Sequence, residues 1–419
     1  MNDEHKLIRK EARNKTREKR KGQTVKVYEI KIDSSHLSKE KQEYLRRLFL
    51  EAKWFYNSIL GCGDVFGFNE KLRKVVVLNK DRVPEDREII NLTAQMRQDI
   101  KSRTIDSIKG LSVKKKKGKS REVGKLKFKS RVSSIPLKQY GMTYKIRNSK
   151  YINLQGFRKD FKVMGLNQIP VGAEFANANL VRKASGYYFK ITCYIEKVKK
   201  ELTNRVIGLD FGIKDSIVDS DGNRYNFQFP ESKRIKEISR KFNKVKKGTK
   251  RHSRLYNQLQ KAYEKNTNKK TDARNKFVSK LVKGNDLTVM QDESIKAWRS
   301  SGLNGFGRRV QHSILGGIKS DLMRHSETLM VDKWFPSTQL CPECKRLNKI
   351  GLGERLYRCE CGYIEDRDKH SARNNLNKGL ELLKFKMVGS TSLPYEEKTS
   401  TYRTPYASEY LTTPEALTL

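Results

Sequence analysis

Four of the six cysteines in this 419-residue chain lie close together, in a spacing that could bind a metal ion. They form "CPEC" at Cys341 and Cys344 and "CEC" at Cys359 and Cys361. Four thiolates in two pairs can complete a tetrahedral Zn²⁺ shell, although the C-x-C pair is shorter than the C-x-x-C that is usual in zinc ribbons. Four unliganded cysteines are the alternative. Because a four-cysteine shell has no open position, we expect one structural zinc ion that stabilises a small hairpin.

Three carboxylates of the C-terminal half lie where a predicted strand ends or a predicted helix begins. Asp210 ends the strand "VIGLD", Glu293 ends "DLTVMQDE", and Asp366 or Asp368 precedes a helix predicted over 368–385. Three converging carboxylates supply the oxygen ligands that two Mg²⁺ ions need for phosphodiester hydrolysis. Taken singly, each Asp could equally be a turn or helix cap, so the prediction depends on all three occurring together.

The charge of the chain indicates its partner. Lys and Arg number 91 against 47 Asp and Glu, a formal net charge of +44. Such a charge opposes compaction unless a polyanion neutralises it, so we expect nucleic acid; a basic solvated surface on an ordinary enzyme is the alternative. No apolar run approaches the roughly 18 residues of a spanning helix, and the N-terminus has no signal-peptide pattern. We therefore expect no membrane partner and a cytoplasmic location.

Two basic segments are candidates for contacts with phosphates. Residues 1–22 have almost no hydrophobic periodicity and are predicted to be a flexible arm. The segment 113–131 is predicted to be a basic loop. It contains four successive cations with no aromatic residue among them, namely Lys114, Lys115, Lys116 and Lys117. That composition favours phosphate contact over base stacking, and a loop that only aids solubility is the alternative.

The order of the predicted elements indicates an α+β chain of several domains. A strand-like segment at 24–33 is followed by helical periodicity, and short alternating segments then continue to about 197. This order fits a small β-barrel with a helical insertion. From 206 onward, strands alternate with helical segments up to the cysteine pairs.

Several of these segments resemble one known superfamily. The stretches "IGLDFGIKDSIVDSDG", "VMQDESIKAW" and "RCECGYIEDRDKHSARNNL" resemble the three segments of a RuvC nuclease domain with a zinc finger inserted before the third. "AKWFYNSIL", "KLKFKSR" and "WFPSTQLCPEC" extend the resemblance over most of residues 25–385. The chain thus resembles TnpB proteins and compact type V CRISPR effectors, which are RNA-guided DNA endonucleases. Its "MQDES" differs from the "EDL"-like sequence of many TnpB proteins and is nearer to some small CRISPR effectors.

The resemblance implies a fold and a set of site residues. It implies an N-terminal wedge-type β-barrel with an inserted helical recognition lobe, and a C-terminal RNase H-like RuvC domain with an inserted zinc finger. The implied catalytic and Mg²⁺-binding acids are Asp210, Glu293 and Asp368, since "RD" before the last helix matches Arg367-Asp368. The expected segments are an arm at 1–22, the barrel at 23–205 with its insertion at 36–112, the nuclease domain at 206–385 with its zinc finger at 338–364, and a flexible tail at 386–419.

The resemblance also implies partners. A guide RNA would pair with one strand of target double-stranded DNA, while the protein reads a short flanking motif. One protein or a homodimer would assemble on one RNA, in a prokaryotic cytoplasm and on the nucleoid when bound to DNA. One alternative is an RNase H-like transposase, whose acids are typically ordered Asp, Asp, Glu and not Asp, Glu, Asp as here. The other is an RNA-guided DNA-binding regulator, which would be expected to have lost an acid. The sequence leaves open whether a transposon or a CRISPR locus encodes the chain.

Overall fold

The computed structural model describes residues 3–79, 81, 83–116, 118, 122–198, 200–213, 216–298, 306–351 and 353–389. The chain divides into two compact units, Met1–Lys199 and Lys200–Leu419. Most of the predicted tail, residues 390–419, lies outside the described residues. Among the helices that the structure describes, none is long and apolar enough to cross a bilayer.

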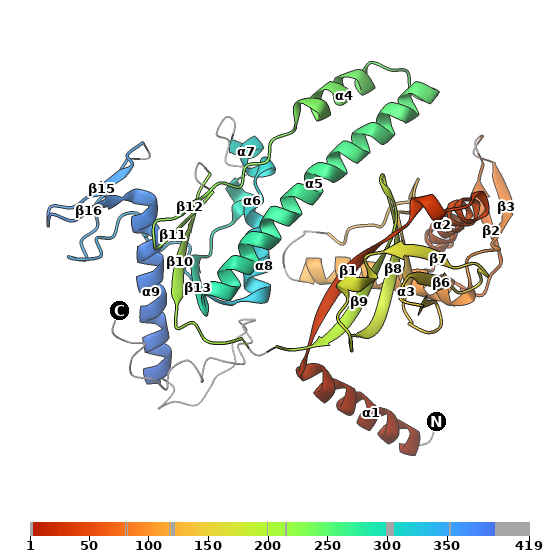
Figure 1. Cartoon of the computed structure of the whole chain (residues 1–419), viewed down its shortest axis with the longest axis horizontal. Coiled ribbons are helices and arrows are strands. Elements are labelled where there is room, and N and C mark those ends of the chain that lie inside the picture. Colours follow the sequence, from red (N-terminus) through yellow and green to blue (C-terminus); the bar gives the residue numbers. More distant parts are fainter. Residues whose placement is uncertain are drawn as a thin grey trace. The chain divides into compact units, whose positions relative to one another are not determined.

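The first unit contains a nearly closed, barrel-like antiparallel sheet (Figure 1). Its seven strands have the spatial order β4-β8-β9-β1-β7-β6-β5. Their bounds are β1 (Gln23–Ile32), β4 (Ser134–Leu137), β5 (Tyr144–Arg147), β6 (Tyr151–Leu154), β7 (Phe161–Met164), β8 (Glu174–Lys183) and β9 (Gly186–Glu196). Alternate residues of β9, among them Phe189, Ile191 and Cys193, are fully buried, as expected of strands that cover a core on one face. An α+β fold with a barrel-like sheet is therefore confirmed.

Helices and a hairpin are inserted between β1 and β4. They comprise η1 (Ser34–His36), α2 (Lys39–Gly61), β2 (Lys74–Leu78), β3 (Pro84–Glu88) and α3 (Ala94–Lys116), and η2 (Leu166–Gln168) follows β7. Ser38 caps α2 by accepting a hydrogen bond from the backbone N–H of Lys41. Within the expected insertion at 36–112, the helix α3 begins only at Ala94, because residues 84–88 pair with β2. It also continues beyond 112, since its last residues are lysines, which are good helix formers.

The N-terminal arm differs from its prediction. Residues Asp3–Lys21 form helix α1 and not a flexible segment. The last turn of α1 is held against the sheet: Lys19 Nζ lies 2.8 Å and Arg20 Nη2 2.6 Å from the carboxylate of Glu174, and the Arg20 guanidinium lies 3.5 Å from the ring centre of Tyr194. A run of Lys, Arg, Glu and Ala has high helix propensity, which compensates for the missing apolar stripe.

The second unit is built on a five-stranded sheet of order β12-β11-β10-β13-β14. The strands are β10 (Val206–Phe211), β11 (Ile217–Asp219), β12 (Arg224–Tyr225), β13 (Leu287–Gln291) and β14 (Glu327–Val331). The strands β10, β13 and β14 are parallel neighbours. The unit begins before the predicted residue 206, because backbone N–H groups of Thr203 and Asn204 donate to the Asp286 carboxylate at 2.8 and 2.7 Å.

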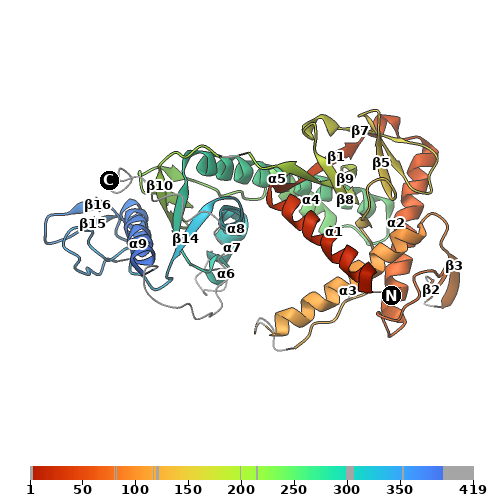
Figure 2. The ribbon, with the colours of Figure 1, turned by 90° about the horizontal axis from the view of Figure 1, so that it is seen from below.

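Helices cover both faces of this sheet. The helices are α4 (Lys233–Asn243), α5 (Lys250–Gly284), α6 (Ile295–Trp298), α7 (Phe306–His312), α8 (Leu315–His325) and α9 (Arg367–Gly389), and a hairpin of β15 (Leu356–Arg358) and β16 (Ile364–Asp366) precedes α9. Figures 1 and 2 show α9 on one face of the sheet and α8 on the other. Ile207 and Leu209 pack toward α5 and α8, whereas an added Cβ at Gly208 would meet α9. Because strand residues alternate, Asp210 also faces α9.

Candidate active site and metal centre

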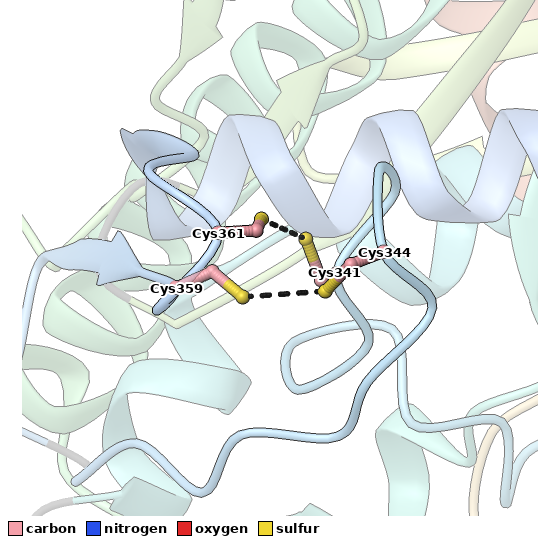
Figure 3. A group of neighbouring side chains, drawn as sticks. All are labelled: Cys341, Cys344, Cys359 and Cys361. Carbon is pink, nitrogen blue, oxygen red and sulfur yellow. Dashed lines mark hydrogen bonds between the residues drawn. The ribbon is translucent and has the colours of Figure 1, made fainter.

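The four cysteines of the two pairs converge on one point (Figure 3). The Sγ atoms of Cys341 and Cys361 lie 3.6 Å apart, those of Cys344 and Cys359 lie 3.5 Å apart, and all four lie within 4.8 Å of one another. A disulfide would need about 2.05 Å. A tetrahedron with Zn–S bonds of about 2.3 Å has S–S edges of about 3.8 Å, which is close to the observed spacing. The cluster therefore has the size and the donor atoms that suit Zn²⁺, and the C-x-C pair contributes both of its sulfurs.

Two tight turns bring the sulfurs together. The N–H of Lys345 donates to the carbonyl of Cys341 at 3.1 Å, and Lys345 has φ of +62°. The N–H of Gly362 donates to the carbonyl of Cys359 at 3.0 Å, with φ of +92° at Gly362. Glycine adopts a left-handed backbone conformation at little energetic cost. Gly362, which follows the second pair, therefore lets Cys359 and Cys361 face the same point although only one residue separates them.

The cysteine hairpin, residues 338–366, has a very small core. Cys341, Tyr357 and Cys359 are its buried residues, and the Tyr357 ring stacks on His370 of α9 with centroids 3.9 Å apart. Burial lowers the pKa of His370 to about 4, so its imidazole is neutral. A hairpin with so small a core would gain much of its folding free energy from a metal bound to the four cysteines, and such an ion would be structural.

The predicted acids lie around one end of the second sheet. Leu209 of β10 is paired with Met290 of the parallel strand β13, so Asp210 and the residues after β13 emerge at the same edge. Asp368 lies in the first turn of α9, which packs on β10. Burial raises the pKa of Asp210 to about 8, and the nearby charges of Glu293 and Asp368 add to this increase. A hydrogen bond from Ser371 acts in the opposite direction and lowers the pKa. The structure thus brings the three acids within electrostatic reach of one another.

Glu293 has an environment that suits a cation. Burial raises its pKa to about 7, and the Lys319 ammonium opposes this shift. In the part of the chain that the structure describes, its Oε2 atom is buried and has no hydrogen-bond partner. The three carboxylates are spread more widely than the thiolates, since only the cysteines among the described residues form a group with ligand atoms within 4.8 Å. Carboxylate oxygens are the ligands that Mg²⁺ prefers, so the chemistry of the three residues suits this cation.

The acids next to these three have other partners. Glu293 follows β13 and does not end it as predicted: the strand stops at Gln291, whose carbonyl accepts the Glu293 N–H at 2.8 Å. The exposed Asp292 pairs with Lys319 at 3.0 Å. Asp366 is the N-cap of α9, because its Oδ1 accepts the backbone N–H groups of residues 368 and 369, both at 3.1 Å. Asp292 therefore faces an ammonium group, and Asp366 binds the first backbone N–H groups of α9.

Arginines surround the third acid. The Asp368 carboxylate lies 3.3 Å from Arg355 of the cysteine hairpin, 3.5 Å from Arg224 of β12 and 3.6 Å from Arg367. Arg224 also pairs with Asp366 at 2.5 Å. These guanidinium groups compensate the charge of Asp368 and add positive potential where a phosphate would approach the acids.

The sequence analysis missed a set of buried polar residues on α9. They are His370, Ser371, Asn374 and Asn375, each at most 2% exposed. The Oγ of Ser371 donates to Asp210 Oδ1 at 2.7 Å, and Asn375 donates to the carbonyl of Leu209 at 3.2 Å. The signal was present in "HSARNN", where polar residues occupy the helical spacing of a buried face.

The predicted basic loop is in part helical. Lys114, Lys115 and Lys116 are exposed in the last turn of α3, whereas Lys117 lies outside the described residues. Their ammonium groups are accessible to a polyanion.

Two family models match segments of the second half of the chain. The model described as "Probable transposase" (OrfB_IS605) matches residues 190–297, which include Asp210 and Glu293. The model described as "Cas12f1-like, TNB domain" matches residues 322–375, which include the four cysteines and Asp368.

Two relatives and one solved structure are also similar to this chain. The chain is 24% identical over 264 residues to a Streptomyces pristinaespiralis protein named as an RNA-guided DNA endonuclease, covering 61% of this chain and 65% of that protein. It is 22% identical over 188 residues to a Mycobacterium tuberculosis protein with a name of the same kind, covering 40% of each chain. A chain in a cryo-EM structure of a Cas12f1-sgRNA-target DNA complex aligns with 85% of this chain and 99% of its own length, at 12% identity and a TM-score of 0.47.

Proposed function

We propose that this chain, which belongs to the superfamily of TnpB proteins and compact type V CRISPR effectors, is an RNA-guided DNA endonuclease. The observation that carries the proposal is the convergence of Asp210, Glu293 and Asp368 at one edge of the second sheet, with raised pKa values at the first two. Little positive charge lies near Asp210 and Glu293 to compensate their carboxylates, so the three acids are suited to bind divalent cations. Guided cleavage in a single RuvC-type site is the function that this arrangement supports best.

The three acids would hold two Mg²⁺ ions, which supply Lewis-acid catalysis of phosphodiester hydrolysis when bound. Asp210 and Glu293 would do so as anions, giving up the protons that burial favours. Asp368 is held by arginines, which would also orient a phosphate of the scissile strand. The four cysteines would hold one Zn²⁺ that stabilises the hairpin before α9.

The charge of the chain supports a nucleic-acid assembly. A formal charge of +44 suits a guide RNA and a target DNA duplex, and Lys114–Lys116 would contact their backbones. In this proposal the first unit is the wedge barrel with its recognition insertion, the second is the RuvC domain with its zinc finger, and base pairing supplies the sequence specificity. The complex would act in a prokaryotic cytoplasm, as one chain or a homodimer on one RNA.

Asp210→Ala in a complex purified with its own RNA tests the proposal. We expect loss of DNA cleavage in Mg²⁺ with guide-dependent DNA binding nearly intact, because the variant removes a metal ligand and leaves the barrel and basic surfaces unchanged. Asp366→Ala is the matched control: it removes a helix cap and should reduce cleavage far less. Full cleavage by Asp210→Ala would refute the site, and guided binding without cleavage by the unmodified protein would favour a DNA-binding regulator.

A further inference from the structure

A buried serine links the first acid to α9. Ser371 is fully buried, and its Oγ lies 2.7 Å from Asp210 Oδ1 and 2.9 Å from the Oγ of Ser337. Ser371 follows Asp368 by three residues, so both lie on the same face of α9. The helix that delivers the third acid therefore also contacts the first.

The hydrogen bonds continue from Ser337 to the strand that precedes the second acid. The Oγ of Ser337 lies 3.2 Å from Gln291 Oε1 and 2.9 Å from the Oγ of Ser371, and it can donate its one proton to either of them while Ser371 donates to Asp210. The orientation of the Gln291 amide is fixed, because its Nε2 donates to three backbone carbonyls at 2.8–3.2 Å, those of Asp332, Lys333 and Phe335. Its oxygen must then face Ser337. Gln291, Ser337, Ser371 and the half-buried Asp210 thus form a row of polar side chains from four segments of the unit.

Asn374 fixes the segment that carries Ser337. Its Nδ2 lies 2.8 Å from the carbonyl of Ser337 and 2.7 Å from that of Leu340, which directly precedes Cys341. The start of the cysteine hairpin is therefore held on the same face of α9 as Ser371. The position of Ser337 depends on both α9 and the hairpin.

We infer that Ser371 is a positioning residue for Asp210, with Ser337 and Gln291 holding its hydroxyl group in place; the inference rests on the proposed function. One carboxylate oxygen of Asp210 is fixed by the Ser371 hydroxyl, so the side chain has one orientation and its other oxygen is presented to a cation. Removing a hydrogen-bond partner of a metal ligand typically costs about 10–100-fold in metal affinity or activity.

The test combines metal binding with cleavage in Ser371→Ala. In the RNA-loaded complex we expect the Mg²⁺ concentration for half-maximal cleavage to rise about 10–100-fold, with the rate largely recovered at high Mg²⁺. Mn²⁺ binding to the purified complex without target DNA, followed by electron paramagnetic resonance, should weaken by a similar factor. Guide-dependent DNA binding and the melting temperature should stay the same, and Ser371→Thr, which keeps the hydroxyl, should restore part of the metal affinity.

Two further variants make the outcome specific. Ser337→Ala should weaken Mn²⁺ binding by a smaller factor, whereas Ser320→Ala should change nothing, because that exposed hydroxyl bonds to Gly316 within α8. An unchanged metal requirement in Ser371→Ala, or a loss that Mg²⁺ does not restore and that comes with a lower melting temperature, would overturn the inference. If Asp210→Ala still abolishes cleavage in that case, the positioning role alone fails; if Asp210→Ala also cleaves, the proposed function fails with it.

Discussion

The helix α9 approaches the sheet closely at Gly208, and Gly208→Ala should separate the acids. A Cβ at this position would lie 2.2 Å from the carbonyl oxygen of Ala372 and 2.8 Å from the Cβ of Leu376. An ordinary contact begins at 3.4 Å, so the gap must widen by about 1.2 Å. The obstructing oxygen belongs to the helix backbone, so α9 must move as a whole away from β10.

The size of both effects can be worked out from that displacement. Overpacking costs about 1–3 kcal/mol of unfolding free energy. For a unit of about 200 residues each kcal/mol lowers the melting temperature by about 2–4 °C, so we expect a decrease of about 2–12 °C. Because α9 carries Asp368 and Ser371 while β10 carries Asp210, a misplacement of about 1 Å should slow cleavage by about 100-fold.

Melting curves and single-turnover cleavage at saturating Mg²⁺ measure the two effects. Gly379→Ala is the informative comparison: its Cβ would lie 2.6 Å from Val289 Cγ1, but it is 11 residues, or about 16 Å, along the helix from Asp368. It should lower the melting temperature by a similar amount and slow cleavage much less. Gly316→Ala, which has open space around it, should change neither. Unchanged melting and cleavage in Gly208→Ala would refute the packing described for α9.

Three more predictions concern other parts of the molecule. Elemental analysis should find about one zinc per chain, since one four-thiolate shell binds one ion; Cys361→Ser should lose it, whereas the exposed Cys62→Ser should keep it, and normal cleavage by metal-free protein would contradict a structural zinc. Neutralising Lys114–Lys117 should weaken binding to all nucleic-acid sequences alike and flatten its salt dependence, because fewer counterions are released; an altered sequence preference at an unchanged salt slope would mean base contacts. Hydrogen bonds from Arg20 and Lys19 lower the pKa of Glu174 to about 2, so the anchoring of α1 should be complete above about pH 4.5 and lost as the pH falls through 2. A carboxyl NMR titration with a midpoint near 4.5 would contradict this. Glu174→Gln should speed amide exchange in the last turn of α1 at pH 7.

The predictable features were those that short sequence patterns determine. The four cysteines could be grouped because metal ligands must lie close in space, and paired spacing in the chain already achieves this. Asp210 could be placed near a strand end because the apolar run before it is typical of a buried parallel strand, although β10 ends one residue later, at Phe211. The α+β character followed from the change of hydrophobic period along the chain.

Features that depend on tertiary contacts could not be predicted in the same way. The helix α1 has no apolar stripe, and its anchor, Glu174, lies 154 residues from Arg20 in the sequence. The end of β13 at Gln291 is set by side-chain bonds to the segment after β14, which no local pattern contains. The partnership of Ser371 with Asp210 joins residues 161 positions apart. Such contacts leave no periodic signal in a single sequence.

The direct passage from β16 into α9 has a consequence for engineering. Strand β16 (Ile364–Asp366) ends at Asp366, which is also the residue that caps α9. No linker therefore separates the cysteine hairpin from the helix that carries Asp368. The hairpin is therefore not an interchangeable module. Asp368 follows Cys361 by seven residues, and this length sets the position of Asp368 relative to the cysteines. A hairpin grafted from another protein would need the same length there to keep Asp368 in place.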